Sequence, residues 1–236
     1  MSILVTGGTG VLGRRVVRAV PGARVLTRSG DGHRGDLLTG AGVADALAGV
    51  TAVVHCATTL GRKDVDITAN LIAAAKQAGN PHLVYISIVG VDRVPLPYYR
   101  AKLAAERLVE DSGLPYSILR ATQFHDLIAK LFAPQRLLLF YPALSFQPVD
   151  TGTVAARLAE LAAGPAQGRT TDLGGPTVWT ARDLAGQYLA AKGRKAARVP
   201  VRLPGRTFAA YRAGHHLAPR NAEGTVEFAD FLAGDL

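Results

Sequence analysis

The chain has 236 residues, of which 48% are hydrophobic and 19% charged, enough to bury a sizeable core in one large domain or in a domain with a small lobe. No apolar run reaches the roughly 18 residues of a membrane-spanning helix, and the N-terminus begins directly on a strand without a signal peptide, so we expect a cytoplasmic protein with no membrane partner. The net charge of +9 is compatible with nucleic acid as a partner. Arginine-rich composition is also typical of proteins from GC-rich genomes, and we do not favour a nucleic-acid partner.

The first seventeen residues have the pattern of a strand, a tight glycine turn and the start of a helix. An apolar run at residues 3–5 is followed by Gly7, Gly10 and Gly13, spaced Gly-x-x-Gly-x-x-Gly. In such a turn one glycine allows the bend, one lets a phosphate approach the backbone, and one lets helix and strand pack closely. The free N–H groups and dipole of the helix N-terminus favour an anion. The turn therefore predicts a dinucleotide diphosphate site; the alternative is a turn that binds nothing.

Strand-length apolar runs then alternate with helix-period segments, which predicts β-α units and a parallel sheet. We expect strands at 23–27, 52–57, 82–88 and 116–120, helices at 41–48, 64–78 and 98–112, and a loop at 30–35. Later the alternation is less regular, with helices expected at 124–132, 151–163 and 181–191 and a strand at 137–140. The predicted fold is α/β, a Rossmann-type doubly wound parallel sheet, with residues 1–122 as the dinucleotide-binding core and 123–236 as a smaller substrate-binding lobe.

The end of the second predicted strand bears on the choice of nucleotide. Arg28 stands where an NAD-binding fold usually carries an acidic residue, and its guanidinium matches a 2′-phosphate. Asp31 could instead hold a ribose diol, so NADP(H) is favoured while NAD(H) stays open. Arg14 is a second candidate for the phosphate. Asp36 can accept a hydrogen bond from an adenine amino group and Leu37 can pack on the ring, although Asp36 can also be a surface cap.

The strand predicted at 52–57 leads into polar residues. Ala57, Thr58 and Thr59 end it near the expected diphosphate and ribose. His55 and Cys56 lie within its apolar run, where a hydrogen-bonded core histidine and a small buried thiol are the expected roles. As the single cysteine, Cys56 also excludes an internal disulfide.

A candidate catalytic group follows the next strand. Tyr98 and Lys102 are four residues apart on a predicted helix and so share a face. The charge of Lys102 is expected to lower the pKa of the Tyr98 phenol, which makes it a general acid or base. Ser87 closes the preceding strand, where its hydroxyl can donate to a substrate carbonyl. The neighbouring Tyr99 leaves open which phenol is used.

These motifs together resemble the short-chain dehydrogenase/reductase superfamily and, within it, the atypical extended, NmrA-like NAD(P)-binding branch. The supporting segments are 6–13, 36–37, 54–57 and 119–124, with Ser87, Tyr98 and Lys102. The resemblance is close over about the first half of the chain and loose over the rest. It implies that the turn binds the diphosphate, that Tyr98 is the acid/base and that Lys102 holds the nicotinamide ribose. It also implies the remaining cofactor contacts, which are Thr9, Val11 and Leu12 in the turn and Ala121, Thr122 and Phe124 along the nicotinamide.

The branch contains reductases, epimerases and proteins that bind the nucleotide only to sense redox state, so it implies the cofactor more firmly than the reaction. We expect an NADP(H)-dependent oxidoreductase that reduces a carbonyl or quinone-type small organic substrate; the alternative is a redox sensor without turnover. The apolar residues Phe124, Leu127, Phe132, Phe140 and Phe146 are candidates for a substrate wall or for ordinary core. A homodimer is a candidate assembly.

Basic residues concentrate near the end of the chain. From Lys192 to Arg220 there are eight lysines and arginines and no acidic residue. We expect a solvated surface face, with an anionic substrate, a partner subunit or nucleic acid as the alternatives.

Overall fold

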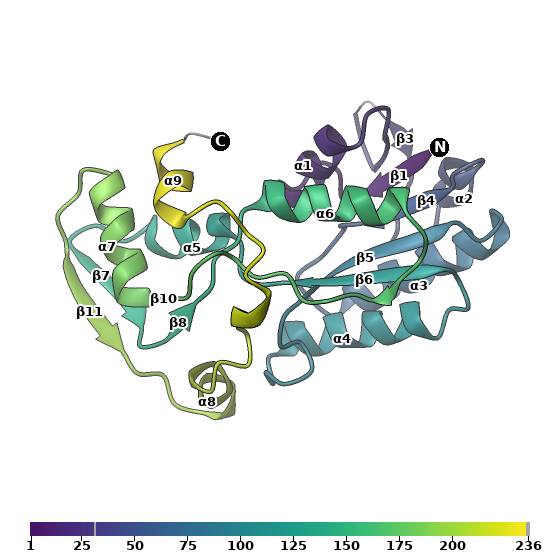
Figure 1. The fold of residues 1–236 in the computed structure, drawn as a ribbon. Coiled ribbons are helices and arrows are strands. Elements are labelled where there is room, and N and C mark those ends of the chain that lie inside the picture. The colour runs from purple at the N-terminus through teal and green to yellow at the C-terminus, as the bar shows by residue number, and fades with distance from the viewer. Residues whose placement is uncertain (31, 235–236) are drawn as a thin grey trace. The chain divides into compact units, whose positions relative to one another are not determined.

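The computed structural model describes residues 1–30 and 32–234 and separates into two compact units, which we describe individually (Figure 1). The first unit contains Met1–Ser87, Leu96–Arg120 and Val154–Thr171, and the second contains Ile88–Pro95, Ala121–Thr153 and the chain from Asp172 onward. Both units are therefore assembled from separate stretches of sequence. The division at residue 122 into a core and a substrate-binding lobe stays a prediction.

The first unit is built on a seven-stranded sheet with the order β3-β2-β1-β4-β5-β6-β9. The strands in chain order are β1 (Ile3–Thr6), β2 (Arg24–Thr27), β3 (His33–Arg34), β4 (Ala52–His55), β5 (His82–Ile88), β6 (Tyr116–Ala121) and β9 (Gly168–Arg169). The order reverses between β1 and β4, which is the switch point where open α/β sheets bind ligands. The predicted doubly wound parallel sheet is confirmed.

The register of the central strands brings their carboxyl ends together. β1 pairs in parallel with β2 and with β4, and Thr6 lies opposite Leu26 on one side and His55 on the other. The segments that follow these three strands therefore leave the sheet at the same edge. This places the glycine turn beside residues 27–29 and 56–58.

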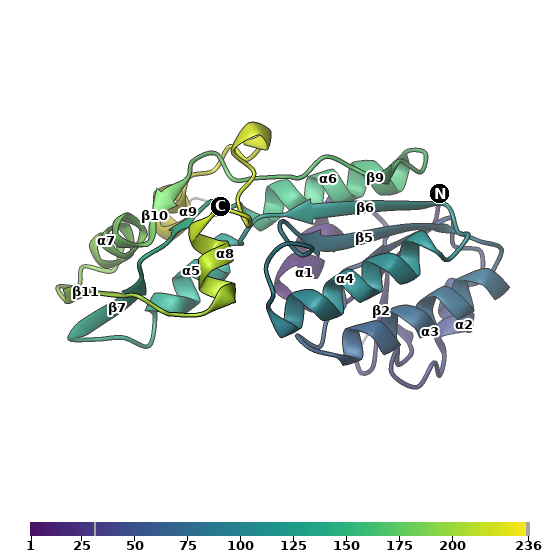
Figure 2. The ribbon, with the colours of Figure 1, turned by 90° about the horizontal axis from the view of Figure 1, so that it is seen from below.

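Helices cover both faces of this sheet, with α1 (Val11–Ala19) and α6 (Thr151–Ala163) on one side (Figures 1 and 2). The other side carries α2 (Val43–Leu47), α3 (Lys63–Gln77) and α4 (Pro97–Glu110). All four residues of β1 and of β4 are buried, as expected for strands covered on both faces. Leu4, Leu71 and Leu83 are fully buried members of the core on the α2–α4 side.

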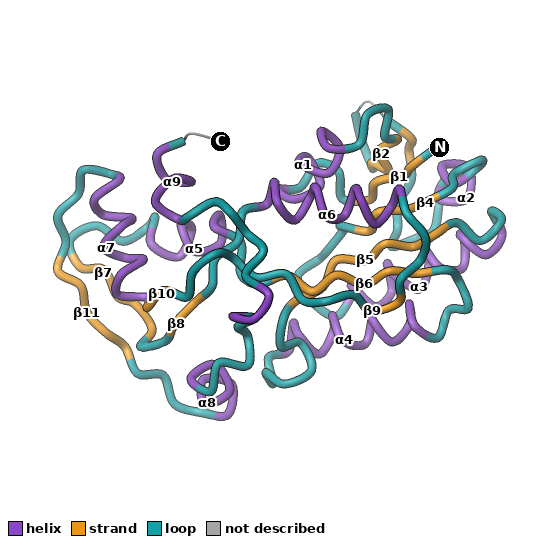
Figure 3. The backbone as a smooth tube through the Cα atoms, viewed as in Figure 1, coloured by secondary structure: helices purple, strands orange, loops and turns teal. Residues whose placement is uncertain are grey.

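The second unit has no large sheet in its described residues. β7 (Leu138–Pro142) pairs in parallel with β11 (Ala197–Val201), and β8 (Ser145–Phe146) pairs antiparallel with β10 (Trp179–Thr180). Its helices are α5 (His125–Phe132), α7 (Ala181–Ala191), α8 (Arg206–Arg212) and α9 (Phe228–Ala233), with a 3-10 turn at Pro219–Asn221. Long loops join these short elements (Figure 3).

The sequence predictions fail mainly for short elements. The helices predicted at 151–163 and 181–191 have those bounds, and the strand expected at 137–140 is displaced to Leu138–Pro142. The predicted loop at 30–35 contains β3, and the pattern missed β8 to β11, α8 and α9 because two to seven residues carry too little periodicity to detect. Among the described helices, none has the length and apolar character needed to cross a bilayer.

Candidate functional site

The glycine turn leaves no room for side chains at two of its positions. Gly7 has φ of 69°, and a Cβ there would lie 2.6 Å from the backbone nitrogen of Ala57. A Cβ at Gly13 would overlap the carbonyl oxygen of Gly7. Gly7 therefore permits the bend from β1 towards α1 close against the segment that follows β4, and Gly13 permits α1 to pack against the turn.

Helix α1 begins at this turn with its first amides uncapped by a side chain. Gly10 is the N-cap residue without a side-chain cap, and its own N–H donates to the Gly7 carbonyl at 2.9 Å. The exposed Arg14 folds back so that its Nε donates to the Thr9 carbonyl at 2.7 Å. Free first-turn N–H groups, the helix dipole and a nearby guanidinium all favour an anion at this point.

A cavity of about 530 Å³ lies in the first unit beside the turn. This volume falls within the range of about 300–1,000 Å³ that is common for small-molecule sites. Eight of the predicted cofactor residues line it: Gly7, Thr9, Gly10, Arg28, Asp36, Leu37, Ala57 and Thr58. Thr59, which the sequence placed near the diphosphate with Ala57 and Thr58, also lines the cavity, whereas sequence reasoning did not assign Ser29, Gly35, Leu38 or Ile67.

Other predicted turn residues are not in the lining. Leu12 is 7% exposed and packs into the core, whereas Val11 is 45% exposed at the start of α1. Together with Gly13, these residues form the first turn of α1, which carries the free backbone N–H groups. Their predicted contact with a diphosphate stays a prediction.

The outer end of the cavity carries the residues predicted to select the nucleotide. Arg28 is exposed directly after β2. Asp36 Oδ1 accepts a hydrogen bond from the Leu38 amide at 2.9 Å, so this carboxylate both caps its loop and lines the cavity. Leu37 is buried, and its carbonyl accepts from Asn70 Nδ2 at 2.8 Å. Asp31, the alternative ribose ligand, lies outside the described residues.

A buried carboxylate that sequence reasoning missed holds the segment after β4. Asp64 is 1% exposed in the first turn of α3, and its Oδ2 accepts from Thr58 Oγ1 at 2.6 Å. Its Oδ1 accepts from the Thr59 amide at 2.5 Å and from Thr59 Oγ1 at 2.7 Å. The sequence signal was two threonines shortly before an aspartate at a predicted helix start, which is typical of a capping arrangement.

His55 has the core role predicted for it, whereas Cys56 is only partly buried and lines the cavity, so the prediction of a buried core thiol is wrong. His55 Nδ1 lies 2.6 Å from Thr6 Oγ1 and its Nε2 lies 3.1 Å from Thr68 Oγ1. Burial lowers the pKa of His55 to about 3, so it is a neutral histidine at physiological pH. Desolvation raises the pKa of Cys56 to about 12, so its thiol holds its proton at neutral pH.

Tyr98, rather than Tyr99, faces the cavity wall. The Tyr98 hydroxyl is 3.4 Å from Oγ1 of the cavity residue Thr58, whereas the Tyr99 ring is buried. Burial raises the pKa of Tyr98; the hydrogen bond with Thr58 opposes this shift, and the negative charge of Asp64 adds to it. The predicted lowering of this pKa by Lys102 is therefore wrong for this structure, because desolvation is the largest effect on the phenol.

Lys102 is buried one helical turn beyond Tyr98. Its Nζ lies 4.2 Å from the centroid of the Tyr85 ring, a cation–π contact, and among the described residues no carboxylate is within ion-pair distance. Burial lowers the pKa of Lys102 to about 8, against the opposing charge of Asp64, so the amine is mostly protonated at neutral pH. The N–H groups of the Lys102 ammonium could donate hydrogen bonds to a ligand hydroxyl.

The hydroxyl of Ser87 is buried and has an unused hydrogen-bonding capacity. It is 3% exposed in β5, and within the described part of the chain its Oγ has no hydrogen-bond partner. A buried hydroxyl without a partner is costly and is satisfied by a ligand atom or water. The glycine cradle, the uncapped helix amides and this hydroxyl fit a dinucleotide, and all of them belong to the first unit.

The predicted nicotinamide residues belong to the second unit. Thr122 Oγ1 donates to the Gln147 carbonyl at 2.6 Å and accepts from the Gly175 amide at 3.2 Å, so its hydroxyl organises the local backbone. Ala121 forms an isolated bridge with Leu173, and Phe124 precedes α5. Their contact with the nicotinamide stays a prediction. Of the candidate wall residues, Phe132 is fully buried core, whereas Leu127 and Phe140 are 58% and 47% exposed.

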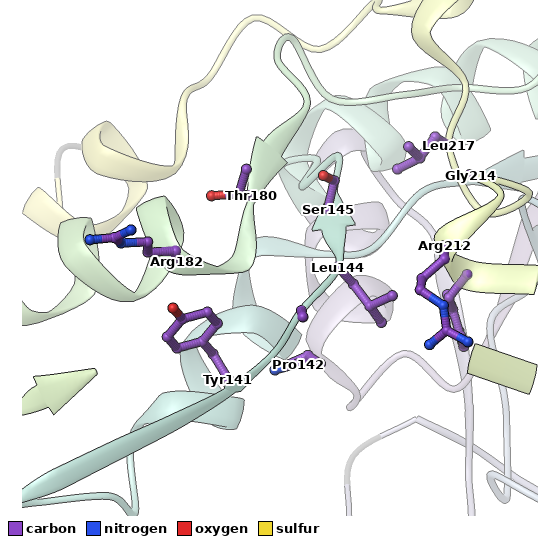
Figure 4. Close-up of a pocket in the computed structure, with 11 residues that line it drawn as sticks. Tyr141, Pro142, Leu144, Ser145, Thr180, Arg182, Arg212, Gly214 and Leu217 are labelled. Atoms are coloured by element: carbon purple, nitrogen blue, oxygen red, sulfur yellow. The ribbon is translucent and has the colours of Figure 1, made fainter. Parts of the chain in front are cut away.

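The second unit has a cavity of its own, of about 410 Å³, which the sequence did not reveal. Figure 4 shows Tyr141, Ser145 and Thr180 around it, with Arg182 and Arg212 on opposite sides. Arg212 Nη1 donates to the Leu203 carbonyl at 3.0 Å, so part of its guanidinium is already engaged. The residues identified in its wall include no acidic side chain.

Comparison with known proteins supports the nucleotide assignment. Residues 30–131 match the family model described as NAD(P)H-binding. A photosystem II assembly factor of Trieres chinensis is 27% identical over 94% of this chain and 80% of its own length. Quinone oxidoreductase 2 of Escherichia coli strain K12 is 23% identical over 82% of this chain and 75% of its own length.

Solved structures show the same fold. The NADPH complex of the quinone oxidoreductase from Escherichia coli superposes with a TM-score of 0.81 at 19% identity, covering 98% of this chain and 99% of that one. A triphenylmethane reductase of Citrobacter sp., in complex with NADP(H), has a TM-score of 0.73 at 20% identity and covers 99% and 95% of the two chains. At these identities the likeness establishes the fold alone.

Proposed function

We propose that this chain, which carries an NAD(P)H-binding domain of the NmrA-like short-chain dehydrogenase/reductase type, is an NADP(H)-dependent oxidoreductase that reduces a carbonyl or quinone-type group of a small organic substrate. The observation that carries the proposal is the Tyr98 hydroxyl, which lies 3.4 Å from Oγ1 of Thr58, a residue that lines the cavity beside the glycine turn. A proton donor thus adjoins a site suited to a dinucleotide.

The choice of NADP(H) is supported by charge. Arg28 and Arg14 place two guanidinium groups near the turn. Arg28 directly follows β2, at the position where a 2′-phosphate would bind. Two structural relatives were solved with NADPH or NADP(H). When bound, the nucleotide would supply hydride. In this arrangement Asp36 and Leu37 would hold the adenine, and Ala57 and Thr58 would lie along the diphosphate and ribose.

Tyr98 would act as the proton donor. Because burial raises its pKa, the phenol holds its proton at neutral pH and can give it to the oxygen of a substrate that gains negative charge. Ser87 Oγ would donate a second hydrogen bond to the same oxygen, which would satisfy its buried hydroxyl. Lys102 would hold a ribose hydroxyl with the ammonium donors that its contact with Tyr85 leaves unused.

The test follows NADPH oxidation spectrophotometrically with a panel of ketones, aldehydes and quinones. Removing the general acid in Tyr98→Phe should lower kcat by roughly 10²–10⁴-fold while leaving NADPH affinity nearly unchanged. Tyr99→Phe, the same chemical change at the neighbouring buried ring, is the matched control and should keep near-normal kcat once circular dichroism shows it folded. Full activity in Tyr98→Phe would refute the assigned role.

A second candidate function is nucleotide binding without turnover. It is favoured by one relative, which is named as an assembly factor rather than as an enzyme and matches 94% of this chain. In that case the protein binds NADPH by calorimetry, with Arg28→Ala weakening the affinity, yet oxidises none of it across the panel. Turnover that depends on Tyr98 excludes this alternative.

A further inference from the structure

The two-stranded ribbon of β7 and β11 in the second unit is covered on one side only. Leu139 and Tyr141 face inward and belong to the core formed with α5, α7 and α9. Side chains alternate along a strand, so Leu138 and Phe140 face the other way. Their register partners are Ala197 and Val199, which share their side of the ribbon. We call these four residues the bare strand face.

The bare strand face is apolar and open to solvent. Leu138 is 49% exposed and Phe140 is 47% exposed, and Leu137, immediately before the strand, is 85% exposed. Ala197 is also exposed, and Val199 is half-buried. Single exposed apolar residues are ordinary, but Leu137, Leu138 and Phe140 are exposed within four positions of one another, and such a grouping is typical of an interaction surface.

The surroundings of this face are positively charged. Arg136 precedes β7, and Lys195 and Arg202 flank β11; all three are exposed. The chain contains no acidic residue between Asp183 and Glu223, and the Asp183 carboxylate is already bound by Thr180 Oγ1 at 2.5 Å. The inward side of β7 packs on α5, whose charged residues are Asp126 and Lys130, and on α7 and α9, which add Arg182, Asp183 and Asp230.

The free edge of β7 is blocked for strand addition. Gln135 Oε1 accepts from the Phe140 amide at 2.7 Å, and Gln135 Nε2 donates to the Phe140 carbonyl at 3.1 Å. A partner strand would have to displace this side chain, so the surface on offer is the side-chain face rather than the backbone edge. A second copy docking on the same face would bring like charges together, which disfavours self-association.

We propose that the bare strand face docks on the surface of an anionic phospholipid bilayer. Leu137, Leu138 and Phe140 would enter the boundary between headgroups and acyl chains, and Arg136, Lys195 and Arg202 would lie at the level of the lipid phosphates. This is attachment in the plane of the interface and needs no spanning helix. It differs from the expectation of no membrane partner, which rested on the absence of a long apolar run.

The test is co-sedimentation of the full chain with vesicles. At low salt, vesicles of phosphatidylcholine mixed with phosphatidylglycerol should bind the protein roughly ten- to a hundredfold more tightly than vesicles of phosphatidylcholine alone, since each basic residue near the surface adds attraction. Raising the ionic strength should reduce this difference. Equal binding to both kinds of vesicle, or binding to neither, would overturn the proposal.

Paired variants separate the apolar contribution from the charged one. Leu138→Ser combined with Phe140→Ser should weaken binding to the anionic vesicles by roughly tenfold or more. Val178→Ser, at a residue 39% exposed elsewhere in the same unit, is its control. Arg136→Gln with Lys195→Gln should weaken binding similarly, whereas Lys76→Gln with Arg107→Gln, in the first unit, should not. Circular dichroism and NADPH affinity establish that each variant is folded.

Two outcomes would assign the surface differently. If the Leu138→Ser, Phe140→Ser variant binds anionic vesicles as the parent does, the attraction is charge alone and the apolar docking is refuted. If sedimentation velocity shows a dimer that this variant dissociates, the occupant is a second copy of the chain and the lipid proposal fails. The proposal does not depend on the enzymatic function, because vesicle binding is measured without turnover.

Discussion

The two units differ in how many faces of their strands are covered by helices. In the first, one parallel sheet lies between two layers of helices, and β1 and β4 are buried along their whole length. In the second, β7 alternates between buried and exposed residues because only one side of its ribbon is covered. When helices cover both faces of a sheet, a ligand can reach it only at the ends of the strands. When only one face of a ribbon is covered, the side chains of the other face remain available for binding.

The units also differ in what they bury besides apolar side chains. The first contains the buried charges Asp64, Lys102, Glu106 and Arg120. In the second, the buried His125 ring stacks on Phe228 and Phe231, with centroid distances of 5.7 and 5.2 Å. The buried Glu106–Arg120 pair makes the first unit sensitive to single substitutions. In the second unit burial lowers the pKa of His125 to about 4, so that unit loses stability as the pH falls through this histidine's ordinary range.

The largest expected effect concerns the buried ion pair of the first unit. Arg120 donates from Nε and Nη2 to the two Glu106 oxygens at 2.9 and 2.6 Å, and both side chains are at most 5% exposed. Glu106→Gln should lower the free energy of unfolding by about 3–5 kcal/mol in urea titrations, because it removes the negative charge and one acceptor oxygen of a buried ion pair. Glu160→Gln breaks an exposed pair with Arg157 and should cost less than about 1 kcal/mol. Similar losses in both variants would contradict this account.

The next effect concerns the glycine turn. Gly13→Ala places a methyl group on the Gly7 carbonyl, and such overpacking costs about 1–3 kcal/mol. If α1 shifts to relieve the overlap, NADPH affinity measured by calorimetry should fall by roughly ten- to a hundredfold. Gly61→Ala is the control, since among the described residues the nearest neighbour of its Cβ would be the Thr59 carbonyl oxygen at 4.0 Å. Unchanged NADPH affinity in Gly13→Ala would show that the turn does not hold the nucleotide.

A smaller effect should appear with pH in the first unit. Burial lowers the pKa of Lys102 from 10.5 to about 8, so between these values the folded state binds fewer protons than the unfolded state. The contribution of Lys102 to the free energy of unfolding should therefore rise with pH across this window, by about 2 kcal/mol, and be constant below it. Urea midpoints at about pH 8 and pH 10 in the parent and in Lys102→Met measure the difference. Parallel pH dependences in the two proteins would exclude such a shift.

The smallest effect belongs to the second unit. Glu227 accepts from Thr177 Oγ1 at 2.6 Å and from Trp179 Nε1 at 3.1 Å, in a partly exposed position. Glu227→Gln keeps one acceptor and should cost about 1 kcal/mol. Trp179 is the only tryptophan, so its fluorescence reports this unit while far-ultraviolet dichroism reports both. A loss as large as that of Glu106→Gln would break the contrast between the units.

Much of the first unit could be predicted from the sequence because its signals are local. The glycine spacing, the fully apolar strands and the helix periods all act within a few residues, and they predicted the doubly wound sheet and eight residues of the cavity wall. The identity of the facing phenol was left open between Tyr98 and Tyr99. The packing of α4 buries the Tyr99 ring and leaves the Tyr98 hydroxyl beside Thr58, and the catalytic role of Tyr98 stays a prediction.

The tertiary structure alone decided the features that depend on residues distant in sequence. Desolvation reversed the expected direction of the Tyr98 pKa shift, and Asp64 became the anchor of Thr58 and Thr59 only when α3 met the end of β4. In the second unit, whether Leu138 or Leu139 faces solvent depends on which side of the ribbon the helices cover. Leu138 and Leu139 are the same residue type, so the sequence alone does not show which of them is buried. Their burial is decided by how the strands and helices pack.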